Sequence, residues 1–158
     1  MKKSKINIIA IDPGTISMGY ALWEEGQDEE KLPKVGLVKF PYNRGVDWYE
    51  RSCFQVNELK KNIGQYMSNC KMVVIELPEY HMVAGVDSII KVAFLIGRIS
   101  SLIPIDNLFL VTPTQWKGQL TKEAVINRIR RYYNNECFEF HADMWDAVGI
   151  GLWALNKF

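Results

Sequence analysis

Hydrophobic and polar residues follow two periods along this chain, one typical of β-strands and one typical of α-helices. Short runs rich in β-branched and aromatic residues predict strands over residues 6–11, 18–24, 34–40, 72–76 and 107–113. Longer segments with apolar residues three or four apart predict helices over residues 47–69, 86–103, 121–133 and 142–155. Three antiparallel strands followed by strand–helix alternation predict an α/β fold with a mixed five-stranded sheet and helices packed on it.

Composition is consistent with one domain spanning residues 1–158, because 48% of the residues are hydrophobic and can fill a single core. The net charge of +1 neither requires nor excludes an anionic partner. Three widely spaced cysteines without a CxxC pair indicate reduced thiols, and we therefore expect a cytoplasmic protein. The longest apolar run, residues 86–103, is interrupted by Asp87, Lys91 and Arg98, so no membrane span is expected.

Acidic residues stand at the ends of two predicted strands and at the start of the last helix. Asp12 follows the run IIAI, and Glu76 ends the run MVVIE. If these strands are neighbours, both carboxylates lie at one edge of the sheet, where open α/β folds place their sites. Asp143 and Asp146 are three residues apart and share a helix face, which continues as the small, apolar AVGIG and suits packing on the sheet.

Four carboxylates gathered in this way, with no obvious basic partner in these motifs, require divalent cations. Oxygen ligands favour Mg²⁺ or Mn²⁺. Two such ions about 4 Å apart, one activating water and one stabilising the leaving oxygen, are typical of phosphodiester hydrolysis. The sequence therefore predicts a two-metal site on Asp12, Glu76, Asp143 and Asp146.

Each acid also has a simpler interpretation. Asp12 is a common turn-former before Pro-Gly, and Glu76 is a strand-end acid that meets solvent. Asp143 is a suitable N-cap for the last helix, and Asp146 a first-turn acid favoured by the helix dipole. The joint occurrence of all four favours the metal site.

Four segments, IDPGTISMGYAL, VVIELPEY, TPTQWKGQLTKEAV and DMWDAVGIG, resemble in order and spacing the RuvC family of Holliday junction resolvases. The resemblance spans nearly the whole chain and implies an RNase H-like fold, a homodimer and a site of four acids with Mg²⁺. Those acids fall on Asp12, Glu76, Asp143 and Asp146. The implied activity is metal-dependent, paired cleavage of four-way and other branched DNA. The small size and short loops are closer to phage and prophage members.

The chain departs from the family pattern at two places. The family's aromatic residue near the catalytic glutamate is matched one place later, by Tyr80. We expect Tyr80 to stack on a base at the junction centre, or alternatively to fold back onto the core. Two family lysines resemble Lys117 and Lys122, but the segment between them is shorter. The resemblance thus implies junction binding but does not specify a cleavage-sequence preference.

Basic residues gather just before the last helix and predict a DNA-binding surface. The segment 117–131 contains a single acid, Glu123, and five basic residues, namely Lys117, Lys122, Arg128, Arg130 and Arg131. They are suited to phosphate contacts, and the alternative is a solvated helix face. Lys122 lies in the first turn of its helix, where the helix dipole disfavours a cation. Its presence there indicates that a group outside the helix requires its charge.

The two histidines are not expected to be metal ligands. His141 lies close enough in sequence to Asp143 to position that acid or to transfer a proton.

The segment 86–103 predicts a dimer from its residues alone. Its apolar side chains spread over most of the helix circumference, and a sheet covers only one face. Gly97 permits close approach of a second helix, and a two-fold pairing would set two sites in symmetric relation. The alternative is that neighbouring helices of the same chain bury this surface.

Three other functions fit parts of the sequence. The first motif also resembles that of actin-like ATPases and sugar kinases, but their second domain and second glycine-rich loop are missing from this sequence. A YqgF-like RNA-processing nuclease of the same fold fits the VVIE and DMWDA segments less well. A non-catalytic branched-DNA-binding protein does not require all four acids.

Overall fold

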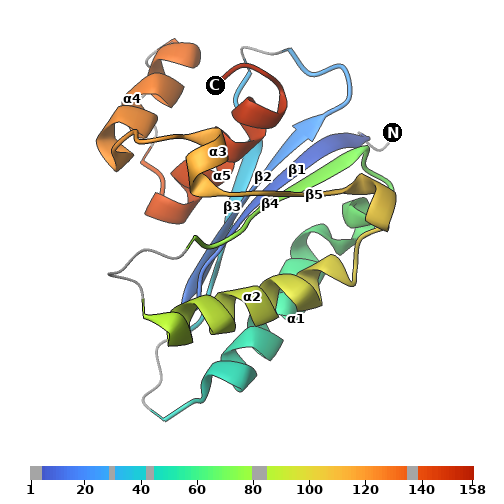
Figure 1. Ribbon diagram of the computed structural model, residues 1–158. Helices are drawn as coiled ribbons and strands as arrows, with labels where there is room; N and C mark the ends of the chain where they lie inside the picture. The colour runs from blue at the N-terminus through green and yellow to red at the C-terminus, as the bar shows by residue number, and fades with distance from the viewer. Residues whose placement is uncertain (1–4, 29–30, 42–44, 80–84, 135–138) are drawn as a thin grey trace.

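The computed structural model describes residues 5–28, 31–41, 45–79, 85–134 and 139–158. Its centre is a five-stranded sheet in the order β3-β2-β1-β4-β5 (Figure 1). The strands are β1 (Ile6–Pro13), β2 (Ser17–Glu24), β3 (Lys34–Lys39), β4 (Met72–Glu76) and β5 (Leu108–Val111). β1, β2 and β3 are antiparallel, whereas β4 is parallel to both β1 and β5. The predicted mixed α/β sheet is confirmed.

Helices cover both faces of this sheet. α1 (Trp48–Met67) and α2 (Val86–Ser100) lie on one face, and α3 (Pro113–Trp116), α4 (Lys122–Tyr132) and α5 (Ala142–Ala154) lie on the other (Figure 1). A 3₁₀ turn, η1 (Ile105–Asn107), leads into β5. The sequence did not predict α3, because four residues are too few to show a helical period. Within the described ranges, no helix is both long and apolar enough to span a membrane.

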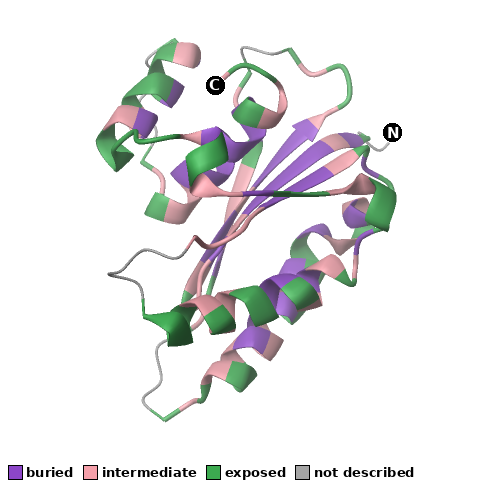
Figure 2. Cartoon of the chain, in the orientation of Figure 1, coloured by how far each residue is buried: buried purple, intermediate pink, exposed green. Residues whose placement is uncertain are grey.

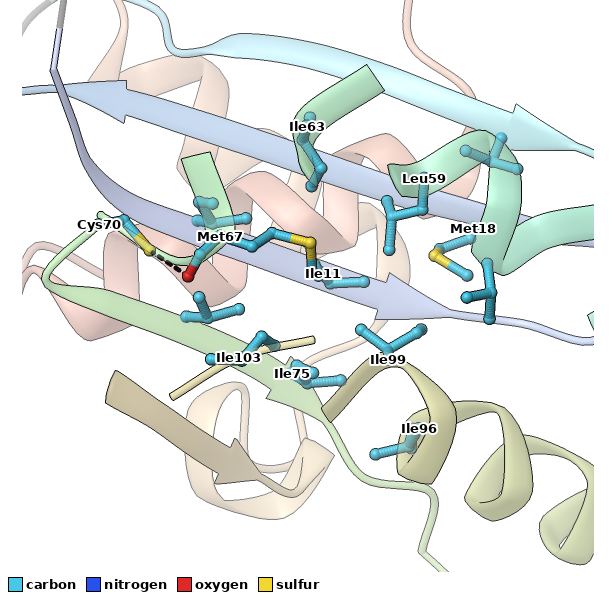
Figure 3. Packing of buried hydrophobic residues seen from close by; sticks show 14 of the residues in the cluster. Ile11, Met18, Leu59, Ile63, Met67, Cys70, Ile75, Ile96, Ile99 and Ile103 are labelled. Atoms are coloured by element: carbon cyan, nitrogen blue, oxygen red, sulfur yellow. Dashed lines mark hydrogen bonds between the residues drawn. The ribbon is translucent and has the colours of Figure 1, made fainter. Parts of the chain in front are cut away.

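The central strand β1 is buried on both faces, which explains its uninterrupted apolar sequence. Ile9 and Ile11 belong to the core cluster shared with α1 and α2, in which Figure 3 shows Ile11. Ile8 and Ala10 instead pack against the α3–α5 layer. Figure 2 shows the same pattern as buried central strands between partly exposed helices. Because side chains alternate between the two faces of a strand, Asp12, two residues after Ala10, also faces the α3–α5 layer.

Helix α5 lies directly on β1 and β2 because glycine permits a close approach at both ends of their contact. A Cβ atom on Gly19 of β2 would lie 2.1 Å from the carbonyl oxygen of Asp143, at the start of α5. A Cβ atom on Gly151 of α5 would lie 1.9 Å from the ring of Trp23 on β2. The expected packing of the small, apolar face of the last helix on the sheet is confirmed.

Candidate active site

Two acids are positioned by the strands. Ile11 of β1 pairs with Ile75 of β4 in parallel register, so the next residues, Asp12 and Glu76, stand side by side at the carboxyl ends of neighbouring strands. Both side chains belong to the face that α5 covers, because side chains alternate along each strand. Asp12 is not a turn residue: it pairs with Gly19 inside the β1–β2 ladder, and β1 continues to Pro13.

Two further acids are positioned by α5. Gly19 is both the ladder partner of Asp12 and the residue against which the backbone of Asp143 packs, so the start of α5 lies over Asp12. The N-cap of α5 is His141, whose Nδ1 accepts from the backbone N–H of Asp143 at 3.4 Å. The alternative that Asp143 is itself the N-cap is therefore wrong. Asp146, one turn further along α5, is buried.

Electrostatic interactions join these four acids into one group. The pKa of Asp12 lies well above its ordinary value, first because of burial and then because Glu76, Asp146 and Asp143 are nearby anions. The pKa of Glu76 is also raised by burial, against the opposing effects of a hydrogen bond from Trp116 and the charge of Lys117. Glu76 is partly buried and accepts a hydrogen bond from Trp116, unlike a strand-end acid that meets only solvent.

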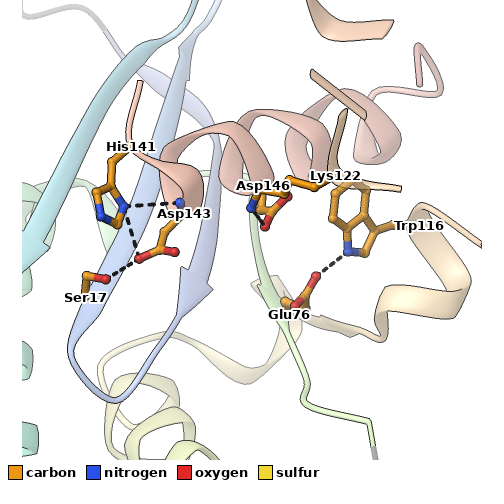
Figure 4. A network of polar contacts seen from close by, with 7 residues as sticks. All are labelled: Ser17, Glu76, Trp116, Lys122, His141, Asp143 and Asp146. Atoms are coloured by element: carbon orange, nitrogen blue, oxygen red, sulfur yellow. Dashed lines mark hydrogen bonds and ion pairs between the residues drawn. The ribbon is translucent and has the colours of Figure 1, made fainter. Parts of the chain in front are cut away.

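Three of the acids have polar partners from other elements (Figure 4). Ser17 donates to Asp143, whose Oδ2 also lies 3.5 Å from Nδ1 of His141. The remaining two partners are Trp116, which donates its indole N–H to Oε2 of Glu76, and Lys122, which forms an ion pair with Oδ2 of Asp146.

These contacts correct and extend the sequence analysis. The expectation that the acids lack a basic partner is wrong for Asp146, because Lys122 reaches it from the first turn of α4. The sequence predicted that a group outside the helix requires the charge of Lys122. That group is the carboxylate of Asp146, inside the site. Ser17, Gly19 and Trp116 were missed. Trp116 does stand directly before Lys117 in a motif already singled out, but nothing in the sequence showed that its N–H meets an acid.

The side chains suit a hard divalent cation in their chemistry. All four acids offer oxygen ligands, and Oδ1 of Asp146 is buried with no hydrogen-bond partner among the residues that the structure describes. Within the same residues, no three side chains of His, Cys, Asp or Glu converge in a geometry that holds a metal ion. Three of the acids instead direct one carboxylate oxygen each toward the partners just described.

The predicted DNA-binding residues fall into two groups. Lys117 and Lys122 lie at the acids: the Lys117 ammonium is 4.8 Å from the centre of the Trp116 ring, and Lys122 pairs with Asp146. Arg128 and Arg131 are exposed further along α4, about 9 Å and about 13 Å from Lys122 along the helix axis. Tyr80 lies outside the described residues.

The class of protein follows from this architecture. A sheet of three antiparallel strands continued by two parallel ones, with helices on both faces, is an RNase H-like fold. Here the fold carries two strand-borne and two helix-borne acids at one end of the sheet.

Comparison with known proteins agrees with this class. The chain is 28% identical to the crossover junction endodeoxyribonuclease RuvC of Aliarcobacter butzleri, over 93% of this chain and 96% of that protein. It is 24% identical to the RuvC protein of Campylobacter concisus, over 96% and 98% of the two chains. No family model matches the chain.

Solved structures show the same fold. Thermus thermophilus RuvC in complex with a Holliday junction substrate superposes with a TM-score of 0.70 and 16% identity, covering 94% of this chain and 91% of that one. A second Thermus thermophilus RuvC structure gives a TM-score of 0.66 with 19% identity over 92% and 91%. The expected resemblance to the RuvC family of crossover junction endodeoxyribonucleases is confirmed over nearly the full length.

Proposed function

We propose that this protein is a structure-selective endodeoxyribonuclease that resolves four-way DNA junctions, and other branched DNA, by hydrolysing phosphodiester bonds. One observation carries the proposal: the β1–β4 register and the docking of α5 on Gly19 bring four interacting acids together in a chain that resembles RuvC from end to end. We propose that residues 1–158 act as one nuclease domain in the cytoplasm of a bacterial or phage-infected cell, where such DNA occurs.

The proposed metal ligands are Asp12, Glu76, Asp143 and Asp146, holding two Mg²⁺ or Mn²⁺ ions. When bound, the ions activate water and stabilise the leaving oxygen of the phosphodiester. The chain's own contribution is orientation. Ser17 and His141 hold Asp143, and Lys122 balances the charge of Asp146.

The proposed DNA surface runs from the acids along α4. Lys117 and Lys122 stand nearest the scissile phosphate, and Arg128 and Arg131 hold phosphates further along the strand. Tyr80 is proposed to stack on a base at the junction centre. Replacing Lys117 or Lys122 by alanine should lower cleavage and flatten the salt dependence of binding, because each phosphate contact releases counterions. An unchanged salt slope in both variants would remove them from this surface.

We propose that the protein forms a homodimer through the exposed side of α2. Leu95, Ile96 and Ile99 are buried, so the sheet side of α2 is covered within the chain. The opposite side carries an exposed stripe of residues spaced three and four apart, namely Val86, Ile90, Ala93, Phe94 and Gly97. A Cβ atom on Gly97 would meet no other described atom within 4 Å, so packing inside this chain does not require glycine there.

The exposed stripe defines the test of dimerisation. Ile90 is 59% exposed, and Ile90→Glu should convert a dimer into a monomer in light scattering without a large loss of thermal stability. Ile105→Glu is the matched control, because Ile105 is 79% exposed and stands apart from α2, in η1. A wild-type protein that is monomeric at micromolar concentration yet makes paired cuts would overturn the proposal.

The decisive experiment on function compares DNA substrates. Synthetic four-way, three-way, flap and linear DNAs are incubated with the protein, with Mg²⁺ or with a chelator, and the cuts are mapped. We expect paired, Mg²⁺-dependent cuts near the branch point of the four-way junction. Junction binding without cuts under all conditions would favour a non-catalytic binding protein, and preferential cleavage of RNA would favour the YqgF-like alternative.

A further inference from the structure

We infer that Trp116 is a positioning residue for Glu76: its indole N–H holds one carboxylate oxygen so that the other is presented to the cation. The inference deepens the proposed function and rests on Glu76 being a metal ligand. The contact that motivates it is the hydrogen bond from Nε1 of Trp116 to Oε2 of Glu76, which joins α3 to the end of β4 (Figure 4).

The local sequence holds Trp116 in place. It ends the single turn of α3, which begins at Pro113 and is closed by a capping box in which Thr112 and Gln115 exchange side-chain and backbone hydrogen bonds. The Trp116 residue is only 3% exposed. A buried indole on a capped turn has little freedom to rotate, so the direction of its N–H is set.

The faces of the ring are also covered. A Cβ atom on Gly149 of α5 would lie 2.5 Å from the Trp116 ring, so the ring lies against the helix that carries Asp146, one turn away. The ring of Phe158 packs at 5.3 Å between centroids, and the Lys117 ammonium lies 4.8 Å from the ring centre. Arg128 in turn lies 4.9 Å over Phe158.

The chemistry of the donor distinguishes this contact from the ion pair of Lys122. An indole N–H donates one hydrogen bond and carries no charge. It therefore restrains the Glu76 carboxylate without neutralising it, whereas Lys122 places a positive charge directly on Asp146. Orientation of a ligand by a fixed neighbouring donor is worth about 10–100-fold in metal affinity in other proteins.

The competing explanation is that Trp116 merely fills the core. Two variants separate the explanations. Trp116→Phe removes the N–H but keeps an aromatic ring, whereas Phe158→Leu loosens the packing of the indole but keeps its N–H. The measurements are the dissociation constant for Mn²⁺, from the paramagnetic resonance signal of free Mn²⁺, and the melting temperature in chelator.

For a positioning role, Trp116→Phe should weaken Mn²⁺ binding about tenfold or more, whereas Phe158→Leu should lower the melting temperature with a much smaller change in Mn²⁺ affinity. In a Glu76→Gln background, Trp116→Phe should cause no further loss of Mn²⁺ affinity, because the carboxylate it positions is gone. Equal losses of Mn²⁺ affinity in the two single variants, or an unchanged affinity in Trp116→Phe, would overturn the inference.

The same titrations test the proposed function separately. If Glu76→Gln binds Mn²⁺ as tightly as the wild type, the proposed metal role of Glu76 fails, whatever Trp116 does. If Glu76→Gln loses affinity but Trp116→Phe does not, the metal role stands and the positioning role alone is overturned.

Discussion

The two strand-borne acids and the two helix-borne acids reach the same end of the sheet by different physical means. Asp12 and Glu76 are placed by the parallel register of β1 and β4, a ladder of backbone hydrogen bonds with buried side chains on both faces. Asp143 and Asp146 depend on how α5 docks, which rests on the contact between Gly19 and the backbone of Asp143. The strand pair is the fixed half of the site, and the helix pair is the half whose position can be altered.

The two pairs also differ in how their charge is handled. Burial raises the pKa of Asp12 and of Glu76, and Asp12 additionally feels the other three acids. The helix acids have polar partners from distant segments, Ser17 for Asp143 and Lys122 for Asp146. The comparison indicates that burial opposes ionisation of both strand acids, whereas the helix acid Asp146 has a cation, Lys122, directly paired with its carboxylate.

The largest effect is expected from neutralising the strand pair. Asp12→Asn or Glu76→Gln should reduce cleavage on the order of a thousandfold or more, because removal of a group essential to catalysis has effects of this size. Junction binding, measured by gel shift with Mg²⁺, should persist or tighten, because less negative charge then stands beside the phosphates. Wild-type cleavage in either variant would show that the acids are misassigned.

An intermediate effect is expected from displacing the helix pair while leaving every acid in place. The added methyl group in Gly19→Ala would overlap the Asp143 backbone, so α5 must shift, at a cost of about 1–3 kcal/mol in the free energy of unfolding. A displacement of reacting groups by about 1 Å can lower a rate about a hundredfold, so cleavage should fall on the order of a hundredfold.

Gly64→Ala is the control for this substitution. Gly64 lies inside α1, where the added methyl group would meet only the flexible side chain of Lys60, and alanine is the better helix former by about 1 kcal/mol. Denaturant unfolding and cleavage rates should separate the two variants. Normal cleavage by Gly19→Ala would show that the position of α5 tolerates a shift.

The smallest effect is expected in the pH dependence of stability without metal. In the unfolded chain, the pKa of an aspartate is about 3.9. In the folded protein, the pKa of Asp12 is raised, so folding disfavours its ionisation. In chelator, the wild type should therefore lose stability relative to Asp12→Asn as the pH rises from about 4 through the folded pKa, with no further change above it. A constant difference in unfolding free energy across this range would contradict the raised pKa.

Local patterns were sufficient for most of the fold. A continuous apolar run identifies β1 as a central strand, and apolar residues at helical spacing identify α1, α2, α4 and α5 within a few residues. These signals are strong because each depends on neighbours in sequence. The short α3 escaped notice for the same reason, since its four residues carry only a capping signal.

Half of the candidate site was also visible in the sequence. Asp12 and Glu76 stand at strand ends and Asp143 and Asp146 share a helix face, so their gathering required that the two strands be neighbours and that the last helix pack on the sheet beside them. Their partners were not visible. No local pattern shows that Lys122 meets Asp146, 24 residues away, or that Trp116 meets Glu76, 40 residues away.

By itself, therefore, the sequence determined the order and type of the main strands and helices and pointed to the four acids proposed as metal ligands. Tertiary structure decided which side chain balances or orients each acid, because such contacts join elements whose relative placement depends on packing across the whole core. It also decided which side of α2 is left exposed. Apolar residues surround that helix, and only docking on the sheet shows that Leu95, Ile96 and Ile99 are covered while Ile90 is not.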